Sequence, residues 1–224
     1  MAKVARVVFF SGMGGDSRMF QRIRVPGFPM ETPEHLEPLA GETLPAFAAR
    51  TAESRGLGED DVVAGMSFGG MLAAQISVQR KIRGAILLGS CHQTRRLPAA
   101  YRAVEFSGRF TPDFLLALRS WRPFVAGRFA PIGPADAAIM AEMAAGYPTS
   151  MLRRFGRMIV EWSGVEAIPC PKLAVHGDKD VILPPSCVDA DVIVPDAGHA
   201  FTLTHPNPIN AAMLEFVNRL AAGK

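Results

Sequence analysis

The sequence predicts an α/β fold whose parallel sheet is covered by helices on both faces. Two observations predict it. Short apolar runs rich in β-branched and aromatic residues alternate with helix-like segments along most of the chain, a pattern typical of parallel sheets. The chain has 224 residues, of which 49% are hydrophobic, and this content is enough for one well-buried core.

The first elements follow from apolar runs and the breaks between them. Residues 4–11 form a β-branched and aromatic run that ends at the glycine-rich loop 12–15, which predicts a buried strand. Residues 20–25 are a weaker strand candidate, ended by Pro26. Residues 42–55 carry apolar side chains on one helical face and predict a helix: Leu44, Phe47, Ala48 and Ala52.

The same alternation continues to the C-terminus. Residues 61–64 predict a strand that leads directly into a helix at 70–80, and residues 82–89 predict the next strand. Two more strands are expected at 172–176 and 192–195. A closing helix is expected at 208–220, where apolar residues recur at helical spacing: Ile209, Ala212, Met213, Phe216 and Leu220.

Residues 91–165 differ from the rest because they contain no convincing strand. Helices are expected at Phe114–Trp121, from Gly133 to Gly146, and from Pro148 onward. An all-helical insert between two strands would form a lid (residues 91–165) on a core made of 1–90 and 166–224. Most of its apolar side chains are expected to pack in the core, and a few would line a substrate pocket. The predicted substrate-binding residues are Phe114, Trp121 and Met158.

Charge and cysteine content exclude several classes of protein. The net charge of +3 is too small to indicate a nucleic-acid partner. The predicted lid holds ten arginines against five acidic residues, which is either a solvated surface or an entrance that favours anionic substrates or a membrane surface. The three cysteines form no disulfide or metal pattern. No run resembles a signal peptide or a membrane span, so a cytoplasmic protein is expected.

The segment Gly65-Met66-Ser67-Phe68-Gly69 is the most informative motif in the chain. It is a G-x-S-x-G sequence between a predicted strand and a predicted helix. A serine at such a turn has a strained backbone, and its neighbours two residues away must approach closely, so both are glycine. The motif therefore predicts that Ser67 is a nucleophile whose hydroxyl stands above the edge of the sheet.

A serine nucleophile needs a base, and the base needs an orienting acid. His199 is the candidate base, because it follows a predicted strand and lies beyond both the turn and the acid in the order expected for this architecture. Asp178 and Asp180 compete for the role of the acid, in the loop after the strand at 172–176. The other four histidines are expected to be structural or peripheral: His35, His92, His176 and His205.

Two backbone N–H groups are expected to bind an oxyanion. One is the N–H of Phe68, directly after the serine. The other is the N–H of Met13, in the glycine-rich loop after the first strand. A nucleotide-binding loop is the alternative for that segment, but the spacing of a dinucleotide fingerprint and the Lys-Ser/Thr of a P-loop are both missing.

These motifs together resemble the α/β-hydrolase superfamily, and the loop at Ser11–Gly15 with the turn around Ser67 resembles a group of small bacterial serine hydrolases and carboxylesterases of unassigned substrate. The resemblance implies a three-layer fold with about six strands in a mostly parallel sheet, without an N-terminal antiparallel hairpin. It favours Asp180 over Asp178 as the orienting acid. The usual His-Gly of the oxyanion loop is Ser11-Gly12 here, and a serine nucleophile disfavours the aspartate-dependent dehalogenases and epoxide hydrolases.

The sequence therefore predicts a serine hydrolase that cleaves a small to medium carboxylic ester through an acyl-enzyme. A thioesterase or a lactonase would use the same three residues. A C–C hydrolase or hydroxynitrile lyase, or a ligand-binding protein without activity, would share the fold. No cofactor is expected. The partner is a small acyl substrate, and the sheet edge or the methionine-rich lid could support a homodimer.

Overall fold

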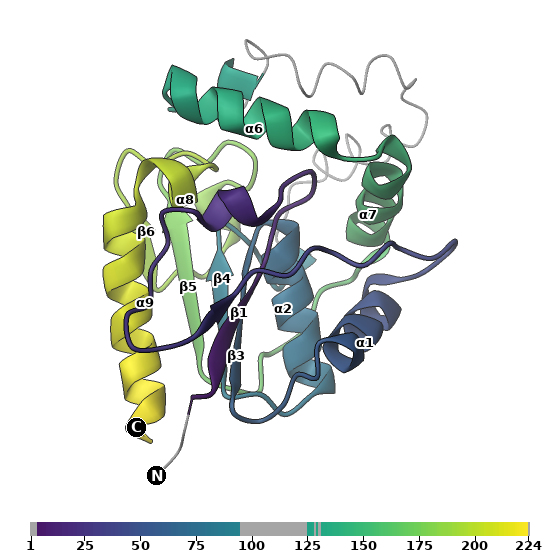
Figure 1. Cartoon of the computed structure of the whole chain (residues 1–224), viewed down its shortest axis with the longest axis vertical. Coiled ribbons are helices and arrows are strands. Elements are labelled where there is room, and N and C mark those ends of the chain that lie inside the picture. Colours follow the sequence, from purple (N-terminus) through teal and green to yellow (C-terminus); the bar gives the residue numbers. More distant parts are fainter. Residues whose placement is uncertain (1–3, 95–124, 128, 130, 224) are drawn as a thin grey trace.

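The core of the molecule is a parallel β-sheet. The computed structural model describes residues 4–94, 125–127, 129 and 131–223. Within them lies a six-stranded sheet of order β2-β1-β3-β4-β5-β6, in which every pairing is parallel (Figure 1). The strands are β1 (Arg6–Phe10), β2 (Met30–Glu31), β3 (Asp61–Met66), β4 (Gly84–Leu88), β5 (Lys172–Gly177) and β6 (Val192–Val194). The predicted parallel sheet is confirmed.

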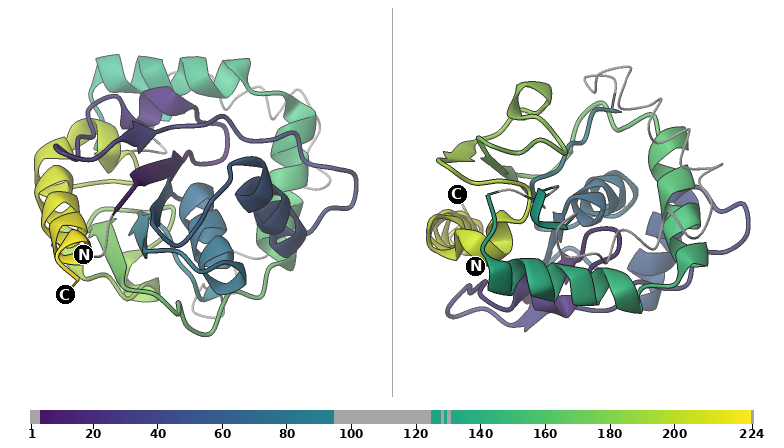
Figure 2. Two further views of the ribbon diagram at one scale, coloured as in Figure 1. Left: turned by 60° about the horizontal axis from the view of Figure 1, so that its bottom comes forward. Right: turned by 90° about the horizontal axis from the view of Figure 1, so that it is seen from above.

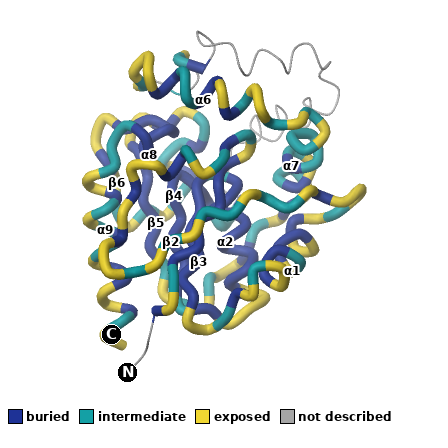
Figure 3. Tube along the Cα trace, in the orientation of Figure 1, coloured by how far each residue is buried: buried dark blue, intermediate teal, exposed yellow. Residues whose placement is uncertain are grey.

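Helices cover both faces of the sheet, and the alternation of side chains along each strand explains why. In β1, Val7 and Phe9 point to one face, whereas Val8 and Phe10 point to the other. All four side chains are buried, because neither face of the sheet meets water (Figure 3). A strand that is apolar at every position is therefore required, and this is the reason that the strands read as continuous apolar runs.

One face is covered by α1 (Leu44–Ser54), α2 (Phe68–Gln79) and α7 (Thr149–Glu161). The other face is covered by α9 (Pro206–Ala221), α8 (Phe201–Thr204), the 3-10 helix η1 (Ser17–Phe20) and α6 (Pro134–Gly146). A short 3-10 helix, η4 (Pro185–Cys187), lies between β5 and β6. Figure 2 shows the resulting three layers from two further directions.

The predicted strand at residues 20–25 is wrong. The side chain of Asp16 accepts a hydrogen bond from the N–H of Arg18 and caps η1, which ends at Phe20. The chain then turns, with the N–H of Ile23 donating to the carbonyl of Phe20 at 2.9 Å. Burial in the core, rather than strand pairing, accounts for the apolar character of this segment. The strand that pairs with the outer edge of β1 is β2. It has only two residues, too few to show an apolar pattern in the sequence.

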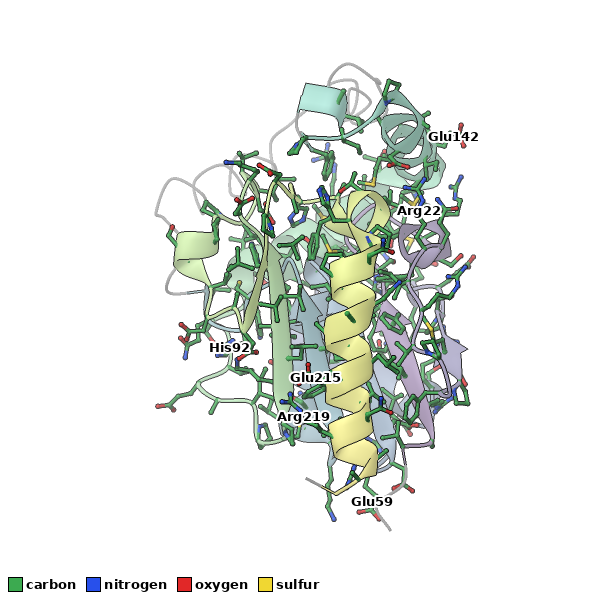
Figure 4. The ribbon with its side chains drawn as sticks, turned by 90° about the vertical axis from the view of Figure 1, so that its left-hand side faces the viewer. Arg22, Glu59, His92, Glu142, Glu215 and Arg219 are labelled. Carbon is green, nitrogen blue, oxygen red and sulfur yellow. The ribbon has the colours of Figure 1, made fainter. Side chains whose placement is uncertain are left out.

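The segment predicted to be a helical lid contributes α6 and α7. In Figure 1, α6 crosses above the carboxyl ends of the strands. Ion pairs join these helices to the rest of the chain: Arg18 to Glu142 at 3.4 Å, Arg22 to Asp136 at 2.8 Å, and Arg154 to Glu37 at 3.4 Å. Figure 4 shows Glu142 on α6 and Arg22 below that helix. Division of the chain into core and lid stays a prediction.

The predicted helix Phe114–Trp121 lies outside the described residues, and so do two of the predicted substrate-binding residues, Phe114 and Trp121. No helix in the described part of the chain is long and apolar enough to cross a membrane.

Candidate active site

Ser67 occupies a strained turn between β3 and α2. Its φ of 52° lies in the left-handed region that residues other than glycine rarely adopt. The glycines on either side permit the turn. A Cβ at Gly65 would lie 2.1 Å from the backbone of Gly69, and a Cβ at Gly69 would lie 2.0 Å from the carbonyl oxygen of Phe10. Backbone atoms cannot move aside as a flexible side chain can, so the G-x-S-x-G spacing is a packing requirement of the turn.

Gly69→Ala is expected to destabilise the fold by about 3 kcal/mol or more, because the new methyl group overlaps the backbone of β1. The matched control is Gly146→Ala, since a Cβ at Gly146 meets no atom of the described residues within 4 Å. Urea unfolding of both variants measures the difference. If the two variants unfold at the same urea concentration, α2 does not approach β1 as closely as the structure indicates.

The backbone of Ser67 is held on both sides. Its N–H donates to the carbonyl of Leu88 at 2.9 Å, and its own carbonyl accepts from the hydroxyl of Ser90 at 2.6 Å. Ser90 was not among the predicted site residues. The sequence shows only that Ser90 directly follows Gly89. In the structure, Gly89 has a left-handed backbone at the end of β4, and β4 pairs with β3, the strand that leads to Ser67.

Asp180 and His199 are brought together, although 19 residues separate them in the chain. The Nδ1 of His199 donates to Oδ2 of Asp180 at 2.6 Å, and both residues are buried. Asp178, the competing acid, is exposed instead. The other carboxylate oxygen of Asp180 accepts from the N–H groups of Ile182 and Leu183 at 2.8 and 2.9 Å. These bonds fix the orientation of the carboxylate independently of its hydrogen bond to the imidazole.

A second histidine contacts the same carboxylate. The Nε2 of His176 donates to the carbonyl of Leu183 at 2.7 Å and lies 3.2 Å from Oδ2 of Asp180. His176 was predicted to be structural or peripheral. It is buried at the end of β5 and belongs to the surroundings of the acid. Its position four residues before the aspartate was the available signal.

The surroundings of Asp180 keep it ionised. Burial on its own raises the pKa of a carboxyl group, because it disfavours the charged form. Here the positive charge that His199 carries when it is protonated, the close contact of His176, and the hydrogen bonds from His199 and Leu183 outweigh burial, and the pKa of Asp180 falls well below its usual range. A carboxylate that stays charged at neutral pH can hold the Nδ1–H of His199, which leaves Nε2 of that ring free to accept a proton.

The glycine-rich loop after β1 lies against Ser67. A Cβ at Gly12 would come within 3.4 Å of the Cβ of Ser67. The N–H of Gly15 donates to the carbonyl of Gly12 at 3.0 Å, and the hydroxyl of Ser11 donates to the carbonyl of Gly15 at 2.9 Å. Among the described residues, the N–H groups of Met13 and Phe68 donate to no partner. Both predicted oxyanion donors therefore have an unused hydrogen.

Of the three predicted substrate-binding residues, the structure describes one. Met158 is on α7 and packs in the core together with Phe155, with 1% of its surface exposed. Two residues without a predicted substrate-binding role lie beside parts of the predicted site. The ring of Phe129 is 6.2 Å from that of His199, and the side chain of Leu152 would lie 3.5 Å from a Cβ at Gly14.

The described residues include no group of three His, Cys, Asp or Glu side chains arranged to hold a metal ion. The three cysteines are free thiols.

The parallel sheet and the strand–serine–helix turn define a class of protein, the α/β hydrolases. The chain belongs to the Alpha/beta hydrolase family, whose model matches residues 7–212. Among curated proteins, none matches this sequence.

Solved structures of similar fold include several enzymes. A thermophilic esterase from Thermogutta terrifontis has 19% sequence identity and a TM-score of 0.76, over 99% of this chain and 92% of that one. A bromoperoxidase from Bacillus anthracis has 19% identity and a TM-score of 0.72, over 96% and 93%. A meta-cleavage product hydrolase from Pseudomonas fluorescens has 14% identity and a TM-score of 0.71, over 98% and 92%. At these identities the likeness shows the fold alone.

Proposed function

We propose that this protein is a serine hydrolase that cleaves small to medium carboxylic esters through an acyl-enzyme. The observation that carries the proposal is the hydrogen bond of 2.6 Å between His199 and a buried, ionised Asp180. This pair follows β5 and β6, and the strained Ser67 follows β3. Since all strands are parallel, the three loops open at the same edge of the sheet.

In the proposed reaction, Nε2 of His199 takes the proton of the Ser67 hydroxyl while Oγ attacks the acyl carbonyl. Asp180 holds the imidazole in the required tautomer and stabilises the imidazolium that forms. The imidazolium then gives its proton to the departing alkoxide, which leaves as an alcohol. A water molecule, deprotonated by the same histidine, attacks the acyl-enzyme, and the acid is released as Ser67 regains its proton.

The negative charge on the tetrahedral intermediate needs donors that are already in place. The unused N–H groups of Met13 and Phe68 are the proposed pair, and the N-terminal end of α2 adds its positive dipole. Loss of one such donor usually costs about 3 kcal/mol of transition-state stabilisation.

The proposal is tested by treating the protein with a fluorophosphonate, measuring its intact mass and mapping the adduct by peptide mass spectrometry. We expect one adduct, on Ser67, together with turnover of p-nitrophenyl esters of short and medium chain length. No adduct on the folded protein would overturn the proposal. An adduct on Ser67 with turnover of acyl-CoA or lactones but not of neutral esters would replace the ester by that substrate class.

A further inference from the structure

His35 lies in an unusual place for a polar side chain. Its ring is surrounded by four phenylalanine rings from four different elements: Phe10 of β1 at 6.5 Å, Phe47 of α1 at 6.3 Å, Phe68 of α2 at 5.5 Å and Phe155 of α7 at 5.3 Å between centroids. The residue was predicted to be structural or peripheral, and the loop that carries it between β2 and α1 is mostly half-buried or exposed. His35 as a whole is half-buried, but its ring packs inward against the apolar core.

Only one nitrogen of this ring has a partner in the described structure. Nε2 lies 2.9 Å from the carbonyl oxygen of Ser11, and a carbonyl only accepts, so Nε2 carries the hydrogen and donates. Nδ1 is buried and has no hydrogen-bond partner. Burial is the main cause that lowers the pKa of His35 to about 4, with a smaller contribution from the charge of Arg55. At neutral pH the ring is therefore an uncharged donor with a fixed direction.

The acceptor of that bond belongs to the loop that carries one proposed oxyanion donor. The Ser11 carbonyl is held by His35, and the next N–H, that of Gly12, points to the sulfur of Met19 at 3.4 Å. The following carbonyl, that of Gly12, is held by the N–H of Gly15. Because the C=O and N–H of one planar peptide point in opposite directions, the N–H of Met13 faces away from this hydrogen bond.

The same ring also contacts the second proposed donor. His35 meets the ring of Phe68 edge to face, with an angle of 67° between the two planes. Phe68 is the residue directly after Ser67, and its N–H is unused within the described part of the chain. One side chain thus links the loop after β1 to the first residue of α2.

We propose that His35 is a positioning residue that fixes the spacing and direction of the Met13 and Phe68 N–H groups, so that both can bind one oxyanion. The inference rests on the proposed function, because it assigns these two groups to the transition state. In the proposed reaction, His35 itself touches no substrate. It acts through the Ser11 carbonyl, and it is the Nε2–H, not the bulk of the ring, that matters.

A role in packing alone makes a different prediction. A phenyl ring would fill the same space among the four phenylalanines. It would also remove Nδ1, a buried atom whose lack of a hydrogen-bond partner lowers the stability of the wild-type protein. If packing were the whole role, His35→Phe would keep both the fold and the rate. If the N–H is needed, the same variant would still fold, because the loss of the hydrogen bond to the Ser11 carbonyl offsets the gain from removing Nδ1, but it would turn over more slowly.

The test compares three variants. His35→Phe removes the donor, His35→Gln keeps an N–H donor at the position of Nε2, and His35→Asn has a side chain too short to reach the Ser11 carbonyl. We expect kcat for a p-nitrophenyl ester to fall about tenfold in the Phe and Asn variants with KM changed less than twofold, since the donors act in the transition state. The Gln variant should recover most of kcat. An unchanged kcat in His35→Phe would overturn the inference.

A second measurement does not depend on ester turnover. Backbone amide resonances of Gly12, Met13 and Phe68 should move in ¹⁵N-labelled His35→Phe and return toward their wild-type positions in His35→Gln. If these resonances stay in place in His35→Phe, the positioning role is wrong even when the enzyme is active. If they move but wild-type protein has no esterase activity and no phosphonate adduct, the proposed function fails while the structural link stands.

Discussion

Ser67→Ala is expected to lower kcat/KM for ester substrates by a factor on the order of 10⁴ or more, to the level that binding and the oxyanion donors provide without a nucleophile. The fold should survive the change. Alanine has the same Cβ as serine, so the left-handed turn at φ 52° is no more strained than before. The bonds that hold the turn use only the backbone of residue 67, namely its N–H and its carbonyl.

Steady-state kinetics and thermal unfolding of the same preparation measure these two effects. Ser186→Ala is the matched control, because Ser186 lies in η4 between β5 and β6 and has no assigned part in the reaction. It should keep the wild-type rate. Wild-type activity in Ser67→Ala would show that another residue is the nucleophile. Loss of cooperative unfolding in that variant would show instead that the serine is structural.

The turn around Ser67 was predictable because its requirements are local. The glycines at 65 and 69 reflect contacts with the backbone of the same turn and of the adjacent β1, so five consecutive residues carry the whole signal. The strands were equally clear. A strand buried on both faces must be apolar at nearly every position, and β1, β3, β4 and β5 all read that way.

Features that depend on tertiary contacts were not predictable in the same way. The pairing of β2 with β1 involves two residues and no apolar pattern, whereas the apolar run at 20–25 is buried without pairing. His35 looks like a surface residue because prolines and glutamates flank it. Its surroundings come from four elements spread over more than a hundred residues, and no local window contains them.

His176 is an intermediate case. Its place at the end of β5, four residues before Asp180, was visible in the sequence, but its role depends on the path of the loop. That loop turns back so that the carbonyl and N–H of Leu183 bind His176 and Asp180 respectively. One short loop thus orders the acid, the second histidine and, through the acid, His199. Precise placement of the base is therefore a property of the loop as a whole.

Asp180→Asn provides the sharpest test of that arrangement, and we expect it to lower kcat by about 10⁴ with little effect on the fold. The amide must still accept from the N–H groups of Ile182 and Leu183, so its oxygen takes the place of Oδ1. Its NH₂ group then takes the place of Oδ2 and donates to Nδ1 of His199. The imidazole must shift its hydrogen to Nε2, where it can no longer accept a proton from a serine.

Asp178→Asn is the matched control for the same chemical change two residues away. Its side chain is exposed, and the hydrogen bond that the residue makes to the carbonyl of Val194 uses the backbone N–H. We expect wild-type kcat in this variant. Because both aspartates fit the sequence pattern, the pair of variants decides between them: a loss in Asp178→Asn with a near-normal rate in Asp180→Asn would reverse the assignment. Equal losses in both would mean that the loop, rather than one carboxylate, is needed for activity.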